Sequence, residues 1–233
     1  MEQEFILHIE TATPVCSIAI SSMGKVIEEF VADVEMSHAS ELMPLIDDAF
    51  KKQNISKDSL IAVSVSSGPG SYTGLRIGVS TAKGICYALG IPLIAVGSLH
   101  SAAWGMKEFL NANNNELLIP MIDARRMEVF AAIYDNSLNE IKAPHPWIID
   151  QDSLAEFADK TIIIGGTGAE KLKPLYSSFK NIVFVEGNVH KASFAAGIAY
   201  NKFVNSDFAD TAYFEPDYGK DFVPGKPTIK GLK

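Results

Sequence analysis

Cysteine, basic charge and long hydrophobic runs are all scarce in this sequence. Cys16 and Cys86 are the only cysteines among 233 residues. They are too few for a disulfide framework and do not form a CxxC pair, so we interpret them as buried thiols, with a single bridge as the alternative. No apolar run approaches the roughly 18 residues of a membrane span, and the first four residues include no basic side chain. These absences predict a cytoplasmic protein without membrane contact.

The charge balance is acidic. The chain has 20 Lys and Arg against 28 Asp and Glu, which gives a formal net charge of −8. Binding of nucleic acid through a broad face depends on clustered Lys and Arg that neutralise phosphates, so a nucleic-acid role would require a partner. The 47% apolar and 21% charged residues are typical of an ordinary globular protein and exclude disorder.

Acidic side chains are missing where phosphate chemistry would need them. No Asp or Glu occurs between Ser59 and Lys107, whereas phosphoryl transfer normally requires carboxylates that hold Mg²⁺ near the phosphates. Glu10 and Asp123, each at the end of a predicted strand, are candidates for a lone metal contact. The alternative is that each of them caps the adjacent turn.

Paired metal ligands and hydrolase motifs are also missing. No two histidines are three or four positions apart, which disfavours a zinc hydrolase, and no GxSxG nucleophile elbow is present. The five histidines are His8, His38, His100, His145 and His190.

The first half of the chain alternates strand and helix patterns. Pro44 is expected to bend the first helix or to mark a new start, and Gly90 is expected to end the second. The polar run 111–115 marks the predicted boundary, which gives an N-terminal lobe over 1–110, a smaller C-terminal lobe over 111–215 and an extended tail over 216–233. The expected strands are 5–10, 15–21, 25–31, 60–66 and 91–96, and the expected helices are 37–52, 74–89 and 98–110.

The second half begins like the first. A strand over 117–122, an acidic turn and a returning strand over 127–134 resemble the opening of the chain, which indicates an internal duplication. A further strand–glycine–helix unit is expected over 161–176, and a last helix over 193–204.

A glycine-rich loop leads into the second predicted helix. Gly68, Gly70 and Gly74 lie in the run Ser67–Gly74, and a glycine loop at a helix N-terminus is a natural anion site. The loop is not a Walker motif, however, and its glycines miss the GxGxxG spacing by one. A tight turn that lets the helix pack closely on the sheet is the alternative.

Two helical faces could pack on each other or on another chain. Small residues recur every four positions at Gly74, Gly78, Ala82 and Cys86, and the helix over 37–52 has one apolar stripe. Periodicity alone leaves open whether these faces form an intramolecular pair or a subunit interface.

Four segments together resemble the TsaB (YeaZ) family. They are ILHIETATPVCSIAI (6–20), SHASELMPLIDDAF (37–50), SGPGSYTGLRIGVSTAKG (67–84) and PMIDARRMEVFAAIY (120–134). The resemblance covers the N-terminal half well and the C-terminal half loosely. It implies an α/β fold of the two-lobed actin-like ATPase (ribonuclease H-like) type, with mixed sheets flanked by helices and a reduced second lobe.

The resemblance also implies a function and partners. TsaB proteins are subunits of the machinery that places N6-threonylcarbamoyl on the adenosine beside the anticodon of tRNA. They bind the related catalytic subunit TsaD, the ATPase TsaE joins the pair, and TsaB forms a homodimer when TsaD is absent. By this resemblance the chain contacts tRNA only indirectly.

Comparison with TsaD-type proteins implies that this chain is not itself catalytic. Two metal-binding histidines of those proteins correspond to Ser98 and Ala102 here, and neither residue type replaces histidine as a ligand. We therefore expect a scaffold subunit without a cofactor, with ATP bound only at a subunit boundary. Any residual phosphate loop would comprise Glu10, Gly68, Gly70 and Gly74.

The resemblance also assigns the two helical faces to the subunit interface. By this interpretation a Gly78→Leu change weakens heterodimerisation and leaves the monomer folded. The expected apolar centre comprises Leu42, Leu45, Ile46, Ala49, Leu75, Gly78, Val79 and Ala82.

Two other functions remain as alternatives. One is an ATP-dependent small-molecule phosphotransferase of the same fold, and the other is a metalloprotease-like hydrolase, which the absent histidine pair disfavours. The sequence departs from the family pattern near the end, where the run Pro216–Lys220 replaces the usual aromatic and basic residues.

Overall fold

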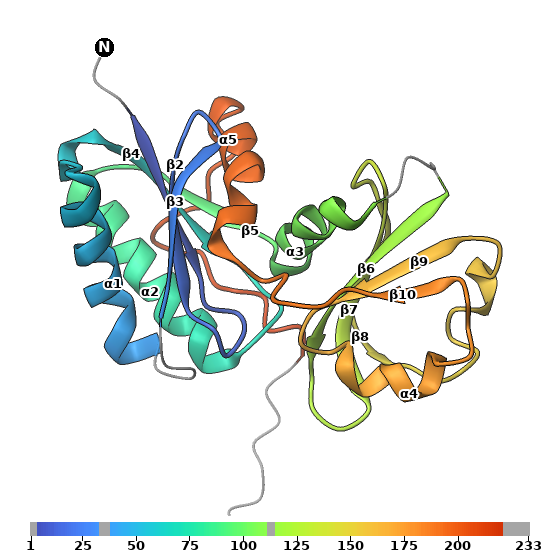
Figure 1. The fold of residues 1–233 in the computed structure, drawn as a ribbon. Helices are drawn as coiled ribbons and strands as arrows, with labels where there is room; N and C mark the ends of the chain where they lie inside the picture. Colours follow the sequence, from blue (N-terminus) through green and yellow to red (C-terminus); the bar gives the residue numbers. More distant parts are fainter. Residues whose placement is uncertain (1–3, 33–37, 111–114, 221–233) are drawn as a thin grey trace, which may run out of the picture.

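The computed structural model describes residues 4–32, 38–110 and 115–220, and contains two five-stranded mixed sheets flanked by helices (Figure 1). The predicted helix start at Ser37, most of the predicted linker over 111–115 and the end of the predicted tail over 221–233 lie outside the described residues. Within the described residues, no helix has the length and apolar character that a membrane crossing requires.

The first sheet has the strand order β3-β2-β1-β4-β5. β1, β2 and β3 form an antiparallel meander, while β1, β4 and β5 run parallel to one another. The strands and helices of this half are β1 (Phe5–Glu10), β2 (Ser17–Ser22), β3 (Lys25–Val31), α1 (His38–Gln53), β4 (Leu60–Ser66), α2 (Tyr72–Leu89), β5 (Leu93–Val96) and α3 (Ser98–Met106).

The second sheet repeats this topology. Its order is β10-β9-β6-β7-β8, again with an antiparallel meander and a parallel set of three strands. The match in strand order and direction confirms the internal duplication that the sequence indicates. The elements are β6 (Glu116–Asp123), β7 (Glu128–Asp135), β8 (Glu140–Ile148), β9 (Thr161–Gly165), α4 (Lys173–Tyr176), β10 (Ile182–Phe184) and α5 (Ala196–Val204).

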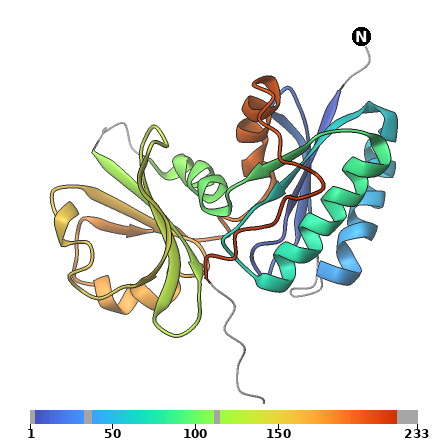
Figure 2. The same ribbon diagram turned by 180° about the vertical axis from the view of Figure 1, so that it is seen from behind.

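Alternating side chains of the first sheet build two separate cores. Leu7 and Ile9 of β1 face α1 and α2, whereas Ile6 faces α5 on the opposite side. This period of two is the geometry that gives a β-strand two buried faces. The first lobe is therefore a sheet between two helical layers (Figure 2).

The predicted division of the chain is wrong for two helices. α5 was assigned to the second lobe, but Ile198 and Ala199 pack on Ile94 and Val96 of the first sheet. α3 was assigned to the first lobe, but it packs mainly on β6 of the second sheet. Sequence order misleads here because the chain returns to the first lobe after completing the second sheet.

Most other predicted elements are present, with differences at short segments. α1 runs through Pro44 without interruption, and Gly90 ends α2 in a left-handed conformation with a φ of 66°. The expected helix over 169–176 is a 3-10 turn, Glu170–Leu172, followed by the single turn of α4. β8 and β10 were not predicted. Cys16 and Cys86 are buried and free, as the simpler interpretation expected.

Truncation of Ile198 in α5 tests whether this helix is part of the first lobe. Ile198→Ala removes a buried side chain from the core against Ile94, so we expect a loss of about 2–5 kcal/mol in the free energy of unfolding. Val204→Ala, at an exposed position of the same helix, is the control and should change it by less than about 0.5 kcal/mol. Urea unfolding measures both, and equal effects would show that α5 is not docked.

Candidate functional site

The carboxylate of Glu10 is turned into the β1–β2 turn. It accepts a hydrogen bond from the backbone N–H of Ala12 at 2.6 Å and a further one from the Ser66 side chain. Burial raises the pKa of Glu10 from 4.5 to about 7, and these hydrogen bonds oppose that shift. Glu10 was a candidate either for a metal contact or for a cap of the adjacent turn, and the geometry supports the cap.

The glycines of the Ser67–Gly74 loop are packed against the chain itself. A Cβ atom at Gly74 would collide with the carbonyl oxygen of Thr11, and one at Gly70 with Ala12. At Gly68, where φ is 102°, a Cβ would collide with the carbonyl oxygen of Asp217. The close approach of backbone to backbone is therefore what these positions require.

Three backbone donors of this loop already have acceptors within the chain. Gly68 N–H donates to the Ser98 hydroxyl at 3.2 Å, Ser71 N–H to the Ala12 carbonyl at 2.7 Å, and Gly74 N–H to the Ser71 hydroxyl at 3.2 Å. The actin-like fold expected from the sequence implies a nucleotide. A phosphate at Gly68 would have to displace Asp217, and a phosphate on any of these three N–H groups would have to break its hydrogen bond, so the residues do not fit a phosphate bound at those positions.

Most of the predicted interface residues lie inside the first lobe. Leu45 is half-buried and packs against the same core. The helical stripes are thus intramolecular, and the assignment of these side chains to contact with a partner is corrected by their burial. The buried residues are Leu42, Ile46, Ala49, Leu75, Gly78, Val79 and Ala82.

The outward faces of α1 and α2 carry different residues. Met43 is 53% exposed and Tyr87 is 87% exposed, and Arg76 lies 4.2 Å from the ring of Tyr72. These side chains alternate with the buried stripes along the same helices. Sequence periodicity identified the stripes but not which side of each helix the sheet covers.

The start of α3 has no ligand pair. Ser98 and Ala102 are both buried, and His100 between them stacks on the Tyr134 ring at 5.5 Å. Burial lowers the pKa of His100. Among the described residues, no group of three or more His, Cys, Asp or Glu is arranged to hold a metal ion.

Residues 207–220, here called the strap, return along α2 and cross the glycine loop (Figure 2). Ala209 bridges to Leu93, and Asp217 N–H donates to the Ser67 carbonyl at 2.8 Å. Lys83 of α2 donates to the Phe214 carbonyl at 3.1 Å. The predicted extended tail is thus extended as far as residue 220, but it is packed on the first lobe.

The strap also connects the two lobes. The Arg76 guanidinium donates to the Tyr218 hydroxyl at 3.0 Å, and Tyr218 packs on Tyr72 with ring centroids 4.6 Å apart. Beyond it, Lys220 pairs with Glu128 at the start of β7. A pocket of about 370 Å³ lies between the strap and α2, lined on the α2 side partly by Arg76 and Lys83.

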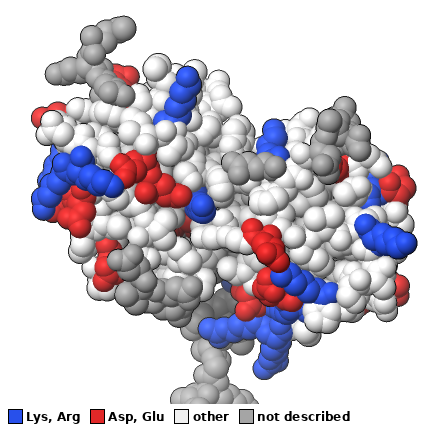
Figure 3. All heavy atoms as spheres, viewed as in Figure 1, with Lys and Arg blue, Asp and Glu red and all other residues white. Residues whose placement is uncertain are grey.

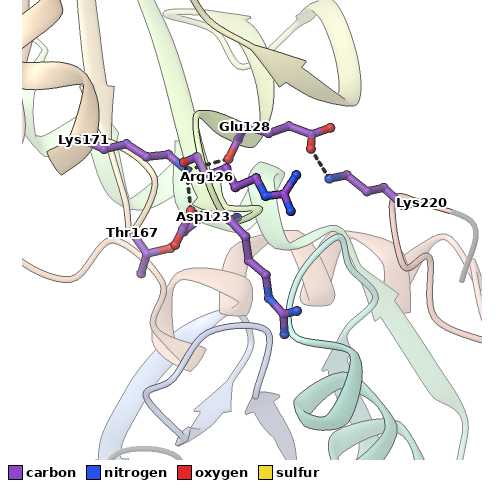
Figure 4. A network of polar contacts seen from close by, with 7 residues as sticks. Asp123, Arg126, Glu128, Thr167, Lys171 and Lys220 are labelled. Atoms are coloured by element: carbon purple, nitrogen blue, oxygen red, sulfur yellow. Dashed lines mark hydrogen bonds and ion pairs between the residues drawn. The ribbon is translucent and has the colours of Figure 1, made fainter. Parts of the chain in front are cut away.

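Lys171 organises the turn between β6 and β7 (Figure 4). Its ammonium pairs with the Asp123 carboxylate and donates to the carbonyls of Arg126 at 2.8 Å and Glu128 at 2.6 Å. Asp123 in turn accepts from the backbone N–H of Arg125 at 3.0 Å. Asp123 therefore caps its turn, which is the alternative to a metal contact.

The packed strap and the role of Lys171 were not predicted from the sequence. Phe214 and Tyr218 in the last segment were a usable signal, because a solvated tail has little need of large apolar rings. Lys171 gave no signal, since a single lysine in a polar segment is ordinarily solvated.

Gly74→Ala tests the close approach of α2 to the β1–β2 turn. The added methyl meets the Thr11 carbonyl, and we expect the free energy of unfolding to fall by about 1–3 kcal/mol or more. Gly84→Ala is the matched control in the same helix, because nothing lies within 4 Å of its Cβ position and alanine favours helix by up to about 1 kcal/mol. Opposite signs in denaturant unfolding are expected. Stabilisation by both changes would contradict the contact.

Glu10→Gln tests the burial of the carboxyl group. Because the folded pKa of about 7 exceeds the unfolded 4.5, the folded state binds the Glu10 proton more tightly, and the Glu10 contribution to stability falls as pH rises between these values. The difference in unfolding free energy between the Gln variant and the original should therefore increase by up to about 3 kcal/mol from about pH 4.5 to about pH 8. A difference that does not change with pH would show that Glu10 is solvated.

Comparison with known proteins identifies relatives of this chain. The family model "TsaD: tRNA N6-adenosine threonylcarbamoyltransferase" matches residues 30–212. The chain is 32% identical over 157 residues to the tRNA threonylcarbamoyladenosine biosynthesis protein TsaB of Bacillus subtilis, and 33% identical over 136 residues to that of Escherichia coli. These alignments cover 66% and 58% of this chain, and 66% and 57% of the respective relatives.

Solved structures show the same fold. YeaZ from Pseudomonas aeruginosa superposes with a TM-score of 0.74 at 20% identity, covering 92% of this chain and 99% of that one. The activator of the 2-hydroxyisocaproyl-CoA dehydratase from Clostridium difficile gives a TM-score of 0.52 at 8% identity, covering 87% of this chain and 97% of that one. The predicted two-lobed actin-like ATPase fold is confirmed. With more than half of its length matched by the family model and with TsaB proteins among its relatives, the chain belongs to the TsaD family and, within it, to the TsaB (YeaZ) group.

Proposed function

We propose that this chain is a non-catalytic subunit in the synthesis of N6-threonylcarbamoyladenosine in tRNA. In this proposal it binds a TsaD-type catalytic subunit and supports its active conformation. A TsaE-type ATPase joins the pair, and the chain forms a homodimer when the catalytic subunit is absent. Membership of the TsaB group supports the pathway.

The observation that carries the non-catalytic part is the filled glycine loop. Asp217 of the strap lies against Gly68, and the Thr11 carbonyl lies against Gly74. Catalysis of phosphate transfer would need that space for a phosphate group and carboxylates nearby for its metal ion. The competing function, a small-molecule phosphotransferase that uses Glu10 and this loop, is therefore the weaker one. The proposal gives the chain no cofactor of its own and leaves ATP to a subunit boundary.

The outward surface of α1 and α2 is the proposed contact with the catalytic subunit. Met43 and Tyr87 are large apolar side chains exposed to solvent on these helices, and aromatic and methionine side chains are enriched in interface centres. Arg76 of α2 adds a guanidinium to this surface, and the rings of Tyr72 and Tyr218 hold it in place. The pocket between α2 and the strap would receive a side chain of the partner.

A pair of methionine variants tests this surface. Met43→Glu places a charge on the proposed contact and should weaken binding of the TsaD-type protein of the same organism by tenfold or more, about 1.4 kcal/mol. Met23→Glu, at a hairpin tip where the side chain is 72% exposed, is the control and should bind normally. Binding is measured by calorimetry and by light scattering during size-exclusion chromatography.

These binding measurements test the contact surface and the proposed function separately. Equal binding by both variants would contradict the contact surface. If the unmodified chain forms no complex with the TsaD-type protein, the proposed function itself fails.

A further inference from the structure

The turn between β6 and β7 presents two adjacent arginines at the surface. The chain has three arginines in all, and Arg125 and Arg126 are both exposed. Within residues 4–32, 38–110 and 115–220, the structure gives neither guanidinium an ion pair or a side-chain hydrogen bond. The third, Arg76, is engaged by Tyr72 and Tyr218.

The acidic groups beside the turn are already neutralised by lysines. Asp123 is paired with Lys171, and Glu128 is paired with Lys220. Figure 4 shows the two lysines reaching these groups from opposite sides of the turn. These two carboxylates therefore do not neutralise the positive charge of the two arginines, although the whole chain carries a net charge of −8.

The backbone of the turn is fixed before any ligand arrives. The three contacts of the Lys171 ammonium, with Asp123 and with the carbonyls of Arg126 and Glu128, hold both sides of the turn. Asp123 N–H also donates to the Thr167 hydroxyl at 3.1 Å. Because the backbone is already ordered, binding costs only the conformational entropy of the arginine side chains and none for the loop.

This fixed backbone is also strained. Arg125 and Arg126 have φ angles of 72° and 53°, in the left-handed region that side chains other than Gly, Asn and Asp disfavour. Asn and Gly are the residues that adopt such φ angles most readily. Strained conformations of this kind are concentrated at binding sites, so the presence of two arginines at these positions points to a ligand.

We propose that Arg125 and Arg126 form a local contact for phosphate groups of an RNA backbone. The guanidinium fork matches phosphate oxygens in a bidentate way. The inference rests on the proposed function, because that function brings the chain into a complex whose substrate is tRNA. It replaces the expectation of purely indirect contact with a contact at one turn, which an acidic chain can make without a broad basic face.

A mononucleotide is the weaker ligand for these arginines. Among the described residues, Asp217 and Thr11 pack against the glycine loop, so this loop offers no neighbouring site for a nucleotide's other phosphates. On the face drawn in Figure 3, basic and acidic side chains are intermixed where the lobes meet. That distribution favours a few point contacts over an extended basic track.

The test measures tRNA binding by the complex of this chain with its TsaD-type partner, as a function of salt. Arg125→Asn with Arg126→Gly should make the negative salt slope, d log K/d log[salt], less steep by roughly 1.5, which corresponds to two lost phosphate contacts. The affinity for tRNA near 0.15 M salt should fall by tenfold or more. Lys57→Ala with Lys180→Ala, at two exposed lysines, removes the same charge elsewhere and is the matched control.

Two further measurements separate binding from folding. The Asn-Gly variant should unfold at a higher temperature than the original, because its residues suit the positive φ angles. Arg125→Lys with Arg126→Lys should retain most of the salt slope, since both charges remain. An unchanged slope in the Asn-Gly variant, or an equal change in the control, overturns the proposal. Excess ATP could also compete with tRNA for binding. If it did so only when both arginines are present, the site would bind a mononucleotide, and the proposal would be overturned.

The same titration distinguishes this proposal from the proposed function. If no complex forms with the TsaD-type protein, the proposed function fails, and the titration is repeated with the chain alone. A less steep salt slope in the Asn-Gly variant would then still support the arginine contact. An unchanged slope would overturn the arginine contact. If the complex forms and the slope is unchanged, only the arginine contact fails.

Discussion

The contact between the start of α2 and the β1–β2 turn is the constraint on which the first lobe depends. The α2 backbone at Gly74 lies directly against the Thr11 carbonyl, which no side chain at position 74 would allow. This closeness places Leu75 and Val79 in the core and keeps the Glu10 carboxyl group buried beneath the turn. A glycine loop at a helix N-terminus is a natural anion site, but the glycines here join two parts of one protein.

The strap extends this constraint to the whole molecule. By lying over Gly68 and then reaching Glu128 through Lys220, it closes the loop and connects the first lobe to the start of β7. α3, which follows β5 but packs on the second sheet, is a second connection. A chain held at two places between its lobes is suited to presenting fixed surfaces to a partner. Opening and closing around a small substrate would require these contacts to break.

Strand and helix patterns predicted most of the fold, because each buried face repeats at its own period. The duplication was visible in the acidic turn that follows both opening strands, at Glu10 and Asp123. The membership of α5 in the first lobe was not predictable, since periodicity gives a helix an apolar face but not its neighbour. β8 was missed because most of its side chains are exposed and it contains Pro144 and Pro146, which weaken a strand pattern.

The candidate site was predicted less completely than the fold. Sequence spacing located the glycine loop and left two interpretations open, and only the positions of Thr11 and Asp217 distinguish them. The stripes with Leu42 and Ala82 were correctly identified as apolar but assigned to the wrong neighbour, since a buried core and the centre of a subunit interface are both apolar and depleted of charge. Positive φ angles at Arg125 and Arg126 have no sequence signature at all, because arginine is not a residue that such turns prefer.

The most direct test of the central claim, that the glycine loop is an internal packing contact, is calorimetric titration of the isolated chain with ATP and Mg²⁺, followed by an assay for ATP turnover. A filled loop predicts no binding heat attributable to this site and no turnover above the solution rate. Tight binding of ATP accompanied by turnover in the chain alone would contradict the account and favour a phosphotransferase.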